Sequence, residues 1–351
     1  MRQIVTLFLC LSASFALVAC NAPTVRKPVS GSDLATSVAL TLAAPATPTV
    51  PALPASATPA ATTEATTTPT PPATATLPPP PEGLSGGVIA YVCFDGNFDH
   101  ICTIRPDGSE QRQITFSAAT DFYPSISPDG QSVVFSTRRD NNFEIYRAGT
   151  DGSNPVRLTQ GIGANYAPEV SPDGTQIVFT NFQGDTQNVW LMNADGSNPR
   201  ALTNASGNNL DPTWSPDGTQ IAFASNRVNS LTSDLWVMNA DGSNQRQLTF
   251  GLELGGRSDW SPDGQWIVFY AGSREGRQRN LYRVNVGSGE VQQLTFGGDN
   301  LGPSYSPDGQ WIVFTSFRDG NNELYLIPAT GGSAIRLTND PGSQWQPRWG
   351  P

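Results

Sequence analysis

The chain has 351 residues with 20 Lys and Arg, 30 Asp and Glu and one His, which gives a formal net charge of −10. A phosphate backbone would repel such a chain, so a nucleic-acid-binding protein is excluded. With 34 Gly, 30 Pro, one His and four Cys, a helical bundle, a zinc site and a Cys/His nucleophile pair are excluded as well.

An export signal is predicted at residues 1–19, where a positively charged start precedes an apolar stretch. That stretch, residues 4–18, has the length of a signal-peptide core and is too short to span a bilayer. It ends in Leu17-Val18-Ala19-Cys20, which resembles the bacterial lipobox. The resemblance implies an exported protein whose lipidated Cys20 anchors it to a membrane, at the cell surface or on the periplasmic side. An ordinary signal peptide with an incidental cysteine is the alternative.

Residues 20–86 are predicted to be a lipidated N-terminus followed by a disordered linker. Between residues 43 and 82, 34 of 40 positions are Pro, Ala or Thr. Such a tract buries too little apolar surface to offset the entropy of ordering it. We expect it to separate the membrane anchor from a folded domain that spans 87–351 and carries the whole net charge of −10.

The predicted folded domain repeats every 44–46 residues. In each repeat a short strand precedes the turn Ser-Pro-Asp-Gly, an alternating strand follows it, and two further strands close on Leu-Thr. Four strands in a period of about 40–45 residues are typical of propeller blades. The pattern resembles the TolB-type, WD40-like (PD40) propeller repeat. The turn begins at Ser127, Ser171, Ser215, Ser261 and Ser306.

The number of strands predicts how the ring closes. The second, third and outer strands each occur six times from Val88 onward, whereas an inner strand precedes Ser-Pro-Asp-Gly only five times. The sixth inner strand is Gln346-Pro347-Arg348-Trp349-Gly350, at the C-terminus. We therefore expect an all-β, six-bladed propeller of four-stranded blades whose first blade is closed by the C-terminal strand, which leaves no long free edge.

Most of the prominent residues have structural explanations. Seven of the eight tryptophans fit strand positions of the repeat. A row of calcium sites would need an Asp-x-Asp-x-Asp loop, which the sequence lacks, so we expect no metal and no cofactor. Cys93 and Cys102 flank the first hairpin and are a candidate disulfide, provided that strand alternation places both side chains on one face. Nine aspartates serve turn geometry: Asp107, Asp129, Asp151, Asp173, Asp195, Asp217, Asp241, Asp263 and Asp308.

The predicted binding surface is the face that carries the loops from outer to inner strands. Short polar residues recur at the start of the inner strands, and aromatic residues without an equivalent in every blade lie beside them. A mixed polar and aromatic rim around a concavity is typical of binding sites, and a solvated loop face with no ligand is the alternative. The candidate binding residues are Asp121, Phe122, Tyr123, Asn165, Tyr166, Asn209, Asp211, Arg257, Asn300, Gln344 and Trp345.

Two functions fit this sequence. In the first, the propeller is a monomeric, non-catalytic module of the cell envelope that binds a protein, a peptide or a glycan, as the TolB-type resemblance implies. In the second, it is a carbohydrate-active hydrolase or lyase that uses rim carboxylates such as Asp121, Asp211 or Asp299. Both stay open at the level of the sequence.

Overall fold

The structure, a computed structural model, describes residue 84 and residues 86–204, 206–272 and 278–351. The predicted signal peptide, Cys20 and the linker up to residue 83 lie outside these described residues. Every regular element within the described ranges is a β-strand. None of these residues forms a helix long and apolar enough to cross a membrane.

The strands form six four-stranded antiparallel sheets, which we number as blades in chain order. Blade 1 has β24 (Gln344–Gly350), β1 (Val88–Phe94), β2 (Asp99–Ile104) and β3 (Arg112–Gln113). Blade 2 has β4 (Asp121–Ile126), β5 (Ser132–Thr137), β6 (Glu144–Gly149) and β7 (Val156–Arg157). Blade 3 has β8 (Ala164–Val170), β9 (Gln176–Gln183), β10 (Thr186–Asn193) and β11 (Arg200–Ala201).

The other three blades have the same build. Blade 4 has β12 (Asn209–Trp214), β13 (Gln220–Ser225), β14 (Asp234–Asn239) and β15 (Arg246–Gln247). Blade 5 has β16 (Asp259–Trp260), β17 (Trp266–Ala271), β18 (Asn280–Asn285) and β19 (Val291–Gln293). Blade 6 has β20 (Asn300–Tyr305), β21 (Trp311–Ser316), β22 (Glu323–Pro328) and β23 (Ile335–Arg336). The predicted six-bladed, four-stranded propeller is therefore confirmed.

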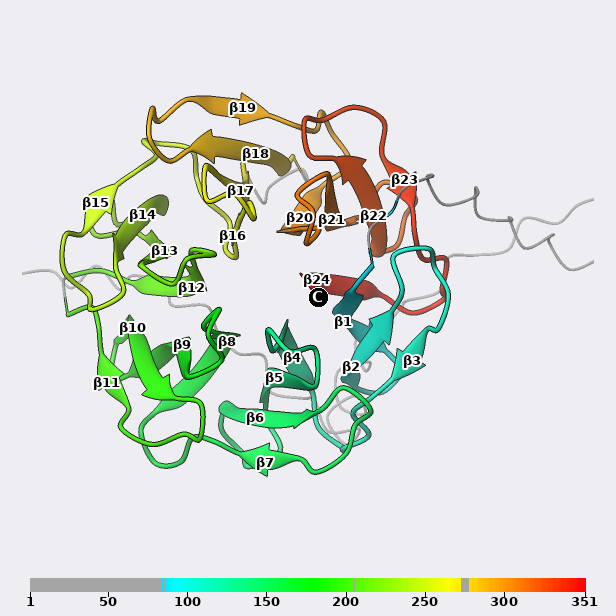
Figure 1. Cartoon of the computed structure of the whole chain (residues 1–351), viewed down its shortest axis with the longest axis horizontal. Helices are drawn as coiled ribbons and strands as arrows, with labels where there is room; N and C mark the ends of the chain where they lie inside the picture. Colours follow the sequence, from blue (N-terminus) through cyan, green and yellow to red (C-terminus); the bar gives the residue numbers. More distant parts are fainter. Residues whose placement is uncertain (1–83, 85, 205, 273–277) are drawn as a thin grey trace, which may run out of the picture. The chain divides into compact units, whose positions relative to one another are not determined.

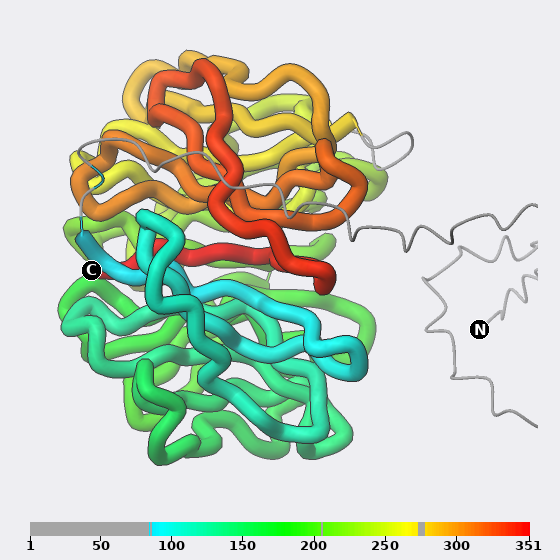
Figure 2. The backbone as a smooth tube through the Cα atoms, turned by 90° about the vertical axis from the view of Figure 1, so that its right-hand side faces the viewer, coloured from blue at the N-terminus to red at the C-terminus, as the bar shows by residue number. Residues whose placement is uncertain are grey.

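The blades surround a common axis, and the first strand of each sheet lies nearest to it (Figure 1). The predicted closure of blade 1 is also confirmed, because the C-terminal strand β24 pairs with β1. In that pairing Val88 lies opposite Gly350 and Cys93 lies opposite Gln344. Figure 2 shows these two ends of the folded domain side by side. One sheet thus joins the beginning and the end of the ring.

The Ser-Pro-Asp-Gly turns are held by the same hydrogen bonds in every copy. The serine hydroxyl donates to the aspartate at 2.5–2.6 Å, and the glycine N–H donates to the serine carbonyl at 2.8–2.9 Å. The glycines have φ between 68° and 74°, which side chains rarely adopt. The hydroxyl bond lowers the pKa of Asp129, Asp173 and Asp217. The turn aspartates are therefore structural, as predicted.

The threonine of Leu-Thr ties each short outer strand to its blade. In all six blades its Oγ1 accepts a backbone N–H of the third strand at 2.9–3.0 Å. The core lies between neighbouring blades, where the second strand contributes one fully buried aromatic ring, each worth about 1.5–3 kcal/mol. These rings are Tyr91, Phe135, Phe179, Phe223, Phe269 and Phe314.

The antiparallel order gives the propeller two different faces. We call the end with the Ser-Pro-Asp-Gly and Asp-Gly-Ser turns the turn face. The opposite end, with the loops from second to third and from outer to inner strands, is the mouth face. Both ends of the folded domain meet at the turn face, since a Cβ built on Gly87 would lie 2.3 Å from the carbonyl oxygen of Gly350. Within the described residues, both ends of the folded domain therefore lie away from the mouth face.

Candidate functional site at the mouth of the propeller axis

Five of the six inner strands carry a β-bulge next to the mouth face. The pairing register shifts there, and the residue before the inner-strand proline is left-handed. Bulges of this kind re-aim side chains and are common beside functional sites. Blade 5 has Arg257 at this position, and its pairing is interrupted there between the Asp259–Val268 pair and the isolated Leu254–Ala271 bridge. The left-handed residues, with φ of 51–53°, are Tyr123, Ala167, Asp211, Gly302 and Gln346.

The short polar residues predicted at the rim have buried side chains. They bond to loops of their own and the preceding blade. Asn165 Nδ2 donates to Glu144 Oε2 at 3.1 Å, and Asn300 Nδ2 donates to Thr295 Oγ1 at 3.0 Å. In the structure these buried side chains hold neighbouring segments together through hydrogen bonds. Their role in binding a ligand stays a prediction. Their exposed fractions are 0–3% for Asp121, Asn165, Asn209, Asn300 and Gln344.

Three arginines of the mouth-face loops hydrogen-bond to these buried polar residues in blades 2, 4 and 6. Arg139 bonds to Asp121, Arg227 to Asn209 and Arg318 to Asn300. Each guanidinium also stacks 4.5–4.6 Å from the ring of an aromatic residue on the third strand. Hydrogen bonding and cation–π contact thus engage these arginines within their own blades. They stabilise loops rather than offer free charge to an anion.

The four candidate aromatic residues lie in one continuous row. The rings of Tyr123 and Tyr166 are 5.9 Å apart, and those of Phe122 and Trp345 are 5.7 Å apart. Phe143, in the loop after β5, joins the two pairs at 6.3 Å from Tyr166 and 6.1 Å from Phe122. All five side chains are half-buried. The row therefore runs along the mouth from blade 3 to blade 1 and forms an aromatic surface.

Two arginines cross the propeller axis from blade to opposite blade. Arg257 of blade 5 donates through Nη1 to the carbonyl oxygen of Pro124 in blade 2 at 3.1 Å. Arg348 of blade 1 donates to Thr213 of blade 4 at 2.9 Å and pairs with Asp259 of blade 5 at 3.1 Å. Blades 2 and 5, and blades 1 and 4, face each other across the ring (Figure 1), whereas blades 1 and 5 are separated by blade 6. Side chains therefore bridge the axis below the mouth.

Asp211 lies in this region with an unsatisfied carboxylate. Its side chain is buried, and its Oδ1 has no hydrogen-bond partner in the described part of the chain. Burial raises the pKa of the Asp211 carboxyl to about 6, although the nearby charge of Arg257 opposes the rise. Burial also raises the pKa of Glu169, whose Oε2 lacks a partner too. Buried polar atoms without partners are costly, and such perturbed groups cluster at functional sites.

The other two carboxylates predicted for catalysis are bound by arginines. Asp121 pairs with Arg139 at 3.3 Å, and Arg279 donates two hydrogen bonds of 2.7 Å to Asp299. No group of three His, Cys, Asp or Glu within the described ranges could hold a metal ion. Of the three candidate acids, Asp211 alone is both buried and without an ion pair in the structure as described.

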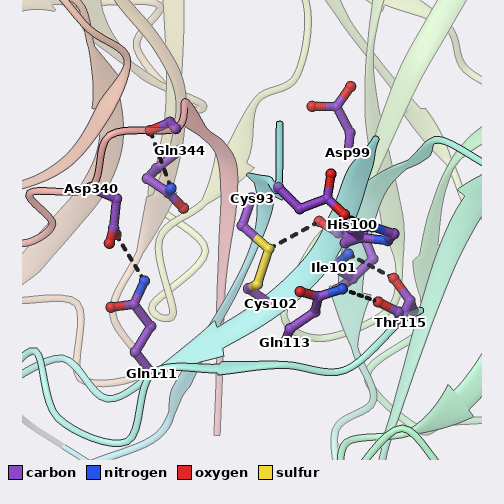
Figure 3. Close-up of a disulfide and its surroundings, with 12 residues drawn as sticks. Cys93, Asp99, His100, Ile101, Cys102, Gln111, Gln113, Thr115, Asp340 and Gln344 are labelled. Carbon is purple, nitrogen blue, oxygen red and sulfur yellow. Dashed lines mark hydrogen bonds and ion pairs between the residues drawn. A yellow bond between two sulfur atoms is a disulfide. The ribbon is translucent and has the colours of Figure 1, made fainter. Parts of the chain in front are cut away.

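Cys93 and Cys102 form a disulfide between β1 and β2 (Figure 3). Cys93 lies opposite His100 and Cys102 opposite Tyr91, so the two cysteines are diagonal neighbours with Cα atoms 5.9 Å apart. The same hairpin supports the aromatic row, because Trp345 Nε1 donates to Asp99 Oδ1 at 3.3 Å. The disulfide thus braces the blade that closes the ring.

Four residues of this region are not among the predicted site residues: Phe143, Glu169, Asp259 and Arg348. The last three occupy one repeat position, two residues after the bulge position, where the other blades have Ser or Thr. A charged residue inside an inner strand was the signal that could have identified them. Phe143 lies in a loop of variable length and gives no such signal.

The comparisons with known proteins agree with this architecture. The family model of the TolB beta propeller domain (PD40) matches residues 159–351. A curated relative, a protein TolB homolog of Chlorobium luteolum, is 37% identical over 62 residues, which are 18% of this chain and 14% of that protein. The match therefore spans a small part of the relative's length.

Two solved structures share the fold. TolB from Acinetobacter baumannii superimposes with a TM-score of 0.69 at 23% identity, covering 76% of this chain and 67% of that chain. A putative TolB from Agrobacterium tumefaciens gives a TM-score of 0.59 at 23% identity, covering 76% of this chain and 99% of that chain. At such identity the likeness concerns the propeller fold.

Proposed function

We propose that this chain, which belongs to the TolB beta propeller (PD40) family, is a non-catalytic module that binds a protein of the cell envelope through its mouth face. Export and lipidation at Cys20 are part of the proposal and rest on the sequence of residues 1–20. The proposed boundaries also rest on the sequence: a signal peptide at 1–19, a linker at 20–86 and a propeller at 87–351.

The observation that carries this proposal is the uneven distribution of exposed apolar side chains. Ten large hydrophobic side chains are exposed in the described residues, and eight of them lie in or beside loops of the mouth face. Large apolar groups gathered on one face are typical of interaction surfaces. The eight are Phe94, Phe98, Phe116, Phe182, Val228, Leu231, Phe250 and Phe296.

Three of these side chains occupy the same repeat position. Phe116, Phe250 and Phe296 each follow the threonine that ends an outer strand, and they are 76%, 74% and 84% exposed. A side chain so exposed contributes little to folding, so its repetition in three blades is not explained by the core. The turn face, in contrast, carries the nine turn aspartates. An apolar partner surface therefore fits only the mouth face.

The arrangement of carboxylates favours binding over catalysis. Hydrolysis or elimination of a glycan needs a proton donor and an acceptor that are free to act on one bond. Asp121 and Asp299 are each neutralised by an arginine, which leaves Asp211 without a second free acid among the three candidates. We therefore favour the non-catalytic function over the carbohydrate-active alternative.

The position of the chain ends also suits this proposal. The predicted linker joins the folded domain at Gly87, on the turn face. This attachment point lies at the end of the domain opposite the mouth-face loops. An anchored protein would thus keep its apolar face available to a partner.

A variant that removes the three equivalent phenylalanines tests the proposal. The triple variant Phe116→Ser/Phe250→Ser/Phe296→Ser should lose the envelope proteins that are recovered with the tagged wild-type chain after cross-linking in cells. Its melting temperature should stay that of the wild type, because the three rings are mostly exposed. The matched control is Val156→Ser/Val291→Ser, which changes the two exposed apolar residues of the outer strands. Equal loss in both variants, or in neither, would refute the proposal.

A further inference from the structure

The Asp211 carboxylate is held in place but is not satisfied. Its backbone N–H donates to Thr180 Oγ1 at 2.9 Å, and this bond fixes the left-handed residue in the bulge of β12. The side chain is 5% exposed, yet Oδ1 accepts no hydrogen bond from the described residues. A buried carboxylate oxygen is normally satisfied by a donor from the protein, from water or from a ligand. Asp211 Oδ1 therefore remains able to accept a hydrogen bond.

Tyrosine side chains surround this carboxylate. The ring of Tyr123 packs 5.9 Å from that of Tyr166, and burial, together with the nearby charge of Asp211, raises the pKa of both hydroxyls. The Tyr270 hydroxyl and Asp211 Oδ2 lie 2.6 Å and 2.9 Å from the point where a Cβ of Gly256 would stand. These two oxygens are therefore within 5.5 Å of each other. The absence of a side chain at Gly256 lets the Tyr270 hydroxyl and the Asp211 carboxylate approach each other this closely.

Among the residues that the structure describes, none forms an ion pair with Asp211. Arg348 pairs with both Glu169 and Asp259. The guanidinium of Arg257 donates to Pro124 and stacks 5.7 Å from the Tyr123 ring, and it makes no ion pair with Asp211. Three carboxylates thus face two guanidinium groups among the described residues of the axis. One further positive charge would neutralise the third carboxylate.

The chemistry of these groups selects the kind of cation. A divalent metal ion would need several oxygen or nitrogen ligands, and no group of three such residues exists in the ranges that the structure describes. A primary ammonium group needs one carboxylate, a few further acceptors and the faces of aromatic rings. Asp211 and the tyrosines Tyr123, Tyr166 and Tyr270 offer this set.

We infer that Asp211, with the rings of Tyr123 and Tyr166, binds a primary ammonium group presented by the partner of the mouth face. This inference rests on the proposed function and names the chemistry that the partner must bring. The ammonium group is either a lysine side chain or the N-terminal amine of a peptide. Because burial raises the pKa of Asp211 to about 6, a proton competes with the ligand, and binding weakens below that pH.

Small probes test the inference on the full chain. Nα-acetyl-lysine methylamide carries only the side-chain ammonium, and alanyl-alanine amide carries only the N-terminal one. Nα,Nε-diacetyl-lysine methylamide carries neither and is the matched control. NMR titration should show one of the two ammonium probes binding at least tenfold more weakly to Asp211→Asn than to the wild type, with no binding of the diacetyl probe.

Further variants separate the site from general effects. Asp185→Asn removes an exposed carboxylate of the β9–β10 turn on the same face and should bind the probe like the wild type. Tyr166→Leu removes a ring without touching the carboxylate and should also weaken binding, which guards against a folding defect of Asp211→Asn. Affinity for the wild type should fall between pH 7.5 and pH 5, and no such fall should remain in Asp211→Asn. Of the other groups that face Asp211, Arg257, Tyr123 and Tyr166 keep their charge state in this range, because the pKa of each lies well above it.

The outcomes distinguish this inference from the proposed function. Equal affinity of the wild type and Asp211→Asn, or binding of the diacetyl probe, overturns the inference. Failure of the wild type to bind either ammonium probe also overturns the inference, even where the triple phenylalanine variant still loses its envelope partner. If the ammonium probe binds through Asp211 but the phenylalanine variant keeps its partner, the site stands and the proposed function fails.

Discussion

Arg348 in the last strand forms an ion pair with Glu169 in blade 3, 179 residues earlier in the chain. The same guanidinium pairs with Asp259 of blade 5 and donates to Thr213 of blade 4. Both partners of the Arg348–Glu169 pair are at most 9% exposed. The C-terminal strand is therefore held not only by pairing with β1 but also by contacts with three other blades.

We expect Arg348→Met to destabilise the propeller strongly. The substitution leaves Glu169 and Asp259 buried without their counterion, which costs about 3–5 kcal/mol. In a domain of this size that corresponds to a melting temperature lower by about 10 °C, measured by circular dichroism at pH 7. Arg138→Met is the control, because Arg138 is exposed and stacks on Phe143. Equal melting of Arg348→Met and the wild type would contradict the role given to the ion pair.

Deletion of residues 344–351 should abolish the cooperative melt. The deletion removes β24, exposes the edge of β1 and takes Arg348 away at the same time. An unpaired edge also promotes association, so size-exclusion chromatography should show aggregates. A chain that ends at Gly350 lacks only the exposed Pro351 and should behave like the wild type. A truncated protein that stays monomeric and melts normally would refute closure of the ring by β24.

The repeat made the fold predictable from the sequence. The contacts across the axis could not be predicted in this way. Turns, strand order and closure follow from local patterns, such as Ser-Pro-Asp-Gly and the missing inner strand before Val88. Arg348 and Glu169 meet because two strands far apart in the chain face one axis, and no spacing in the sequence expresses that. The rim prediction for Asn165 and Asn209 placed polar residues correctly at the start of the inner strands. Their burial depends on partners such as Glu144, at the start of β6, and Arg227, in the loop after β13.

Asp211→Asn should stabilise the protein in a pH-dependent manner. The pKa of Asp211 is raised to about 6 in the folded state, so the folded protein binds this proton more tightly than the unfolded chain. The wild type therefore loses stability as the pH rises from about 4 to about 6, by up to about 3 kcal/mol. The neutral asparagine avoids this loss. Thermal melts at pH 4.5 and pH 8 should show a higher midpoint for the variant only at pH 8, and a pH-independent difference would contradict the account.

Loss of the disulfide should destabilise blade 1 moderately. The double variant Cys93→Ser/Cys102→Ser opens a loop with a sequence separation of 9, for which about 2–3 kcal/mol of stabilisation is expected. Urea unfolding measures this difference. Iodoacetamide should label Cys93 and Cys102 of the native wild type only after reduction. Labelling of both cysteines without reductant would contradict the disulfide.

Site-specific photo-cross-linking in cells shows whether the partner binds at the mouth face. A photoreactive phenylalanine analogue replaces Phe250 on the mouth face in one chain and Asp241 in a turn of the opposite face in another. Both positions are exposed, so neither replacement should disturb the fold. We predict that irradiation in cells links an envelope protein to the Phe250 position and none to the Asp241 position. Cross-links of equal yield from the two positions, or from Asp241 alone, would contradict the claim.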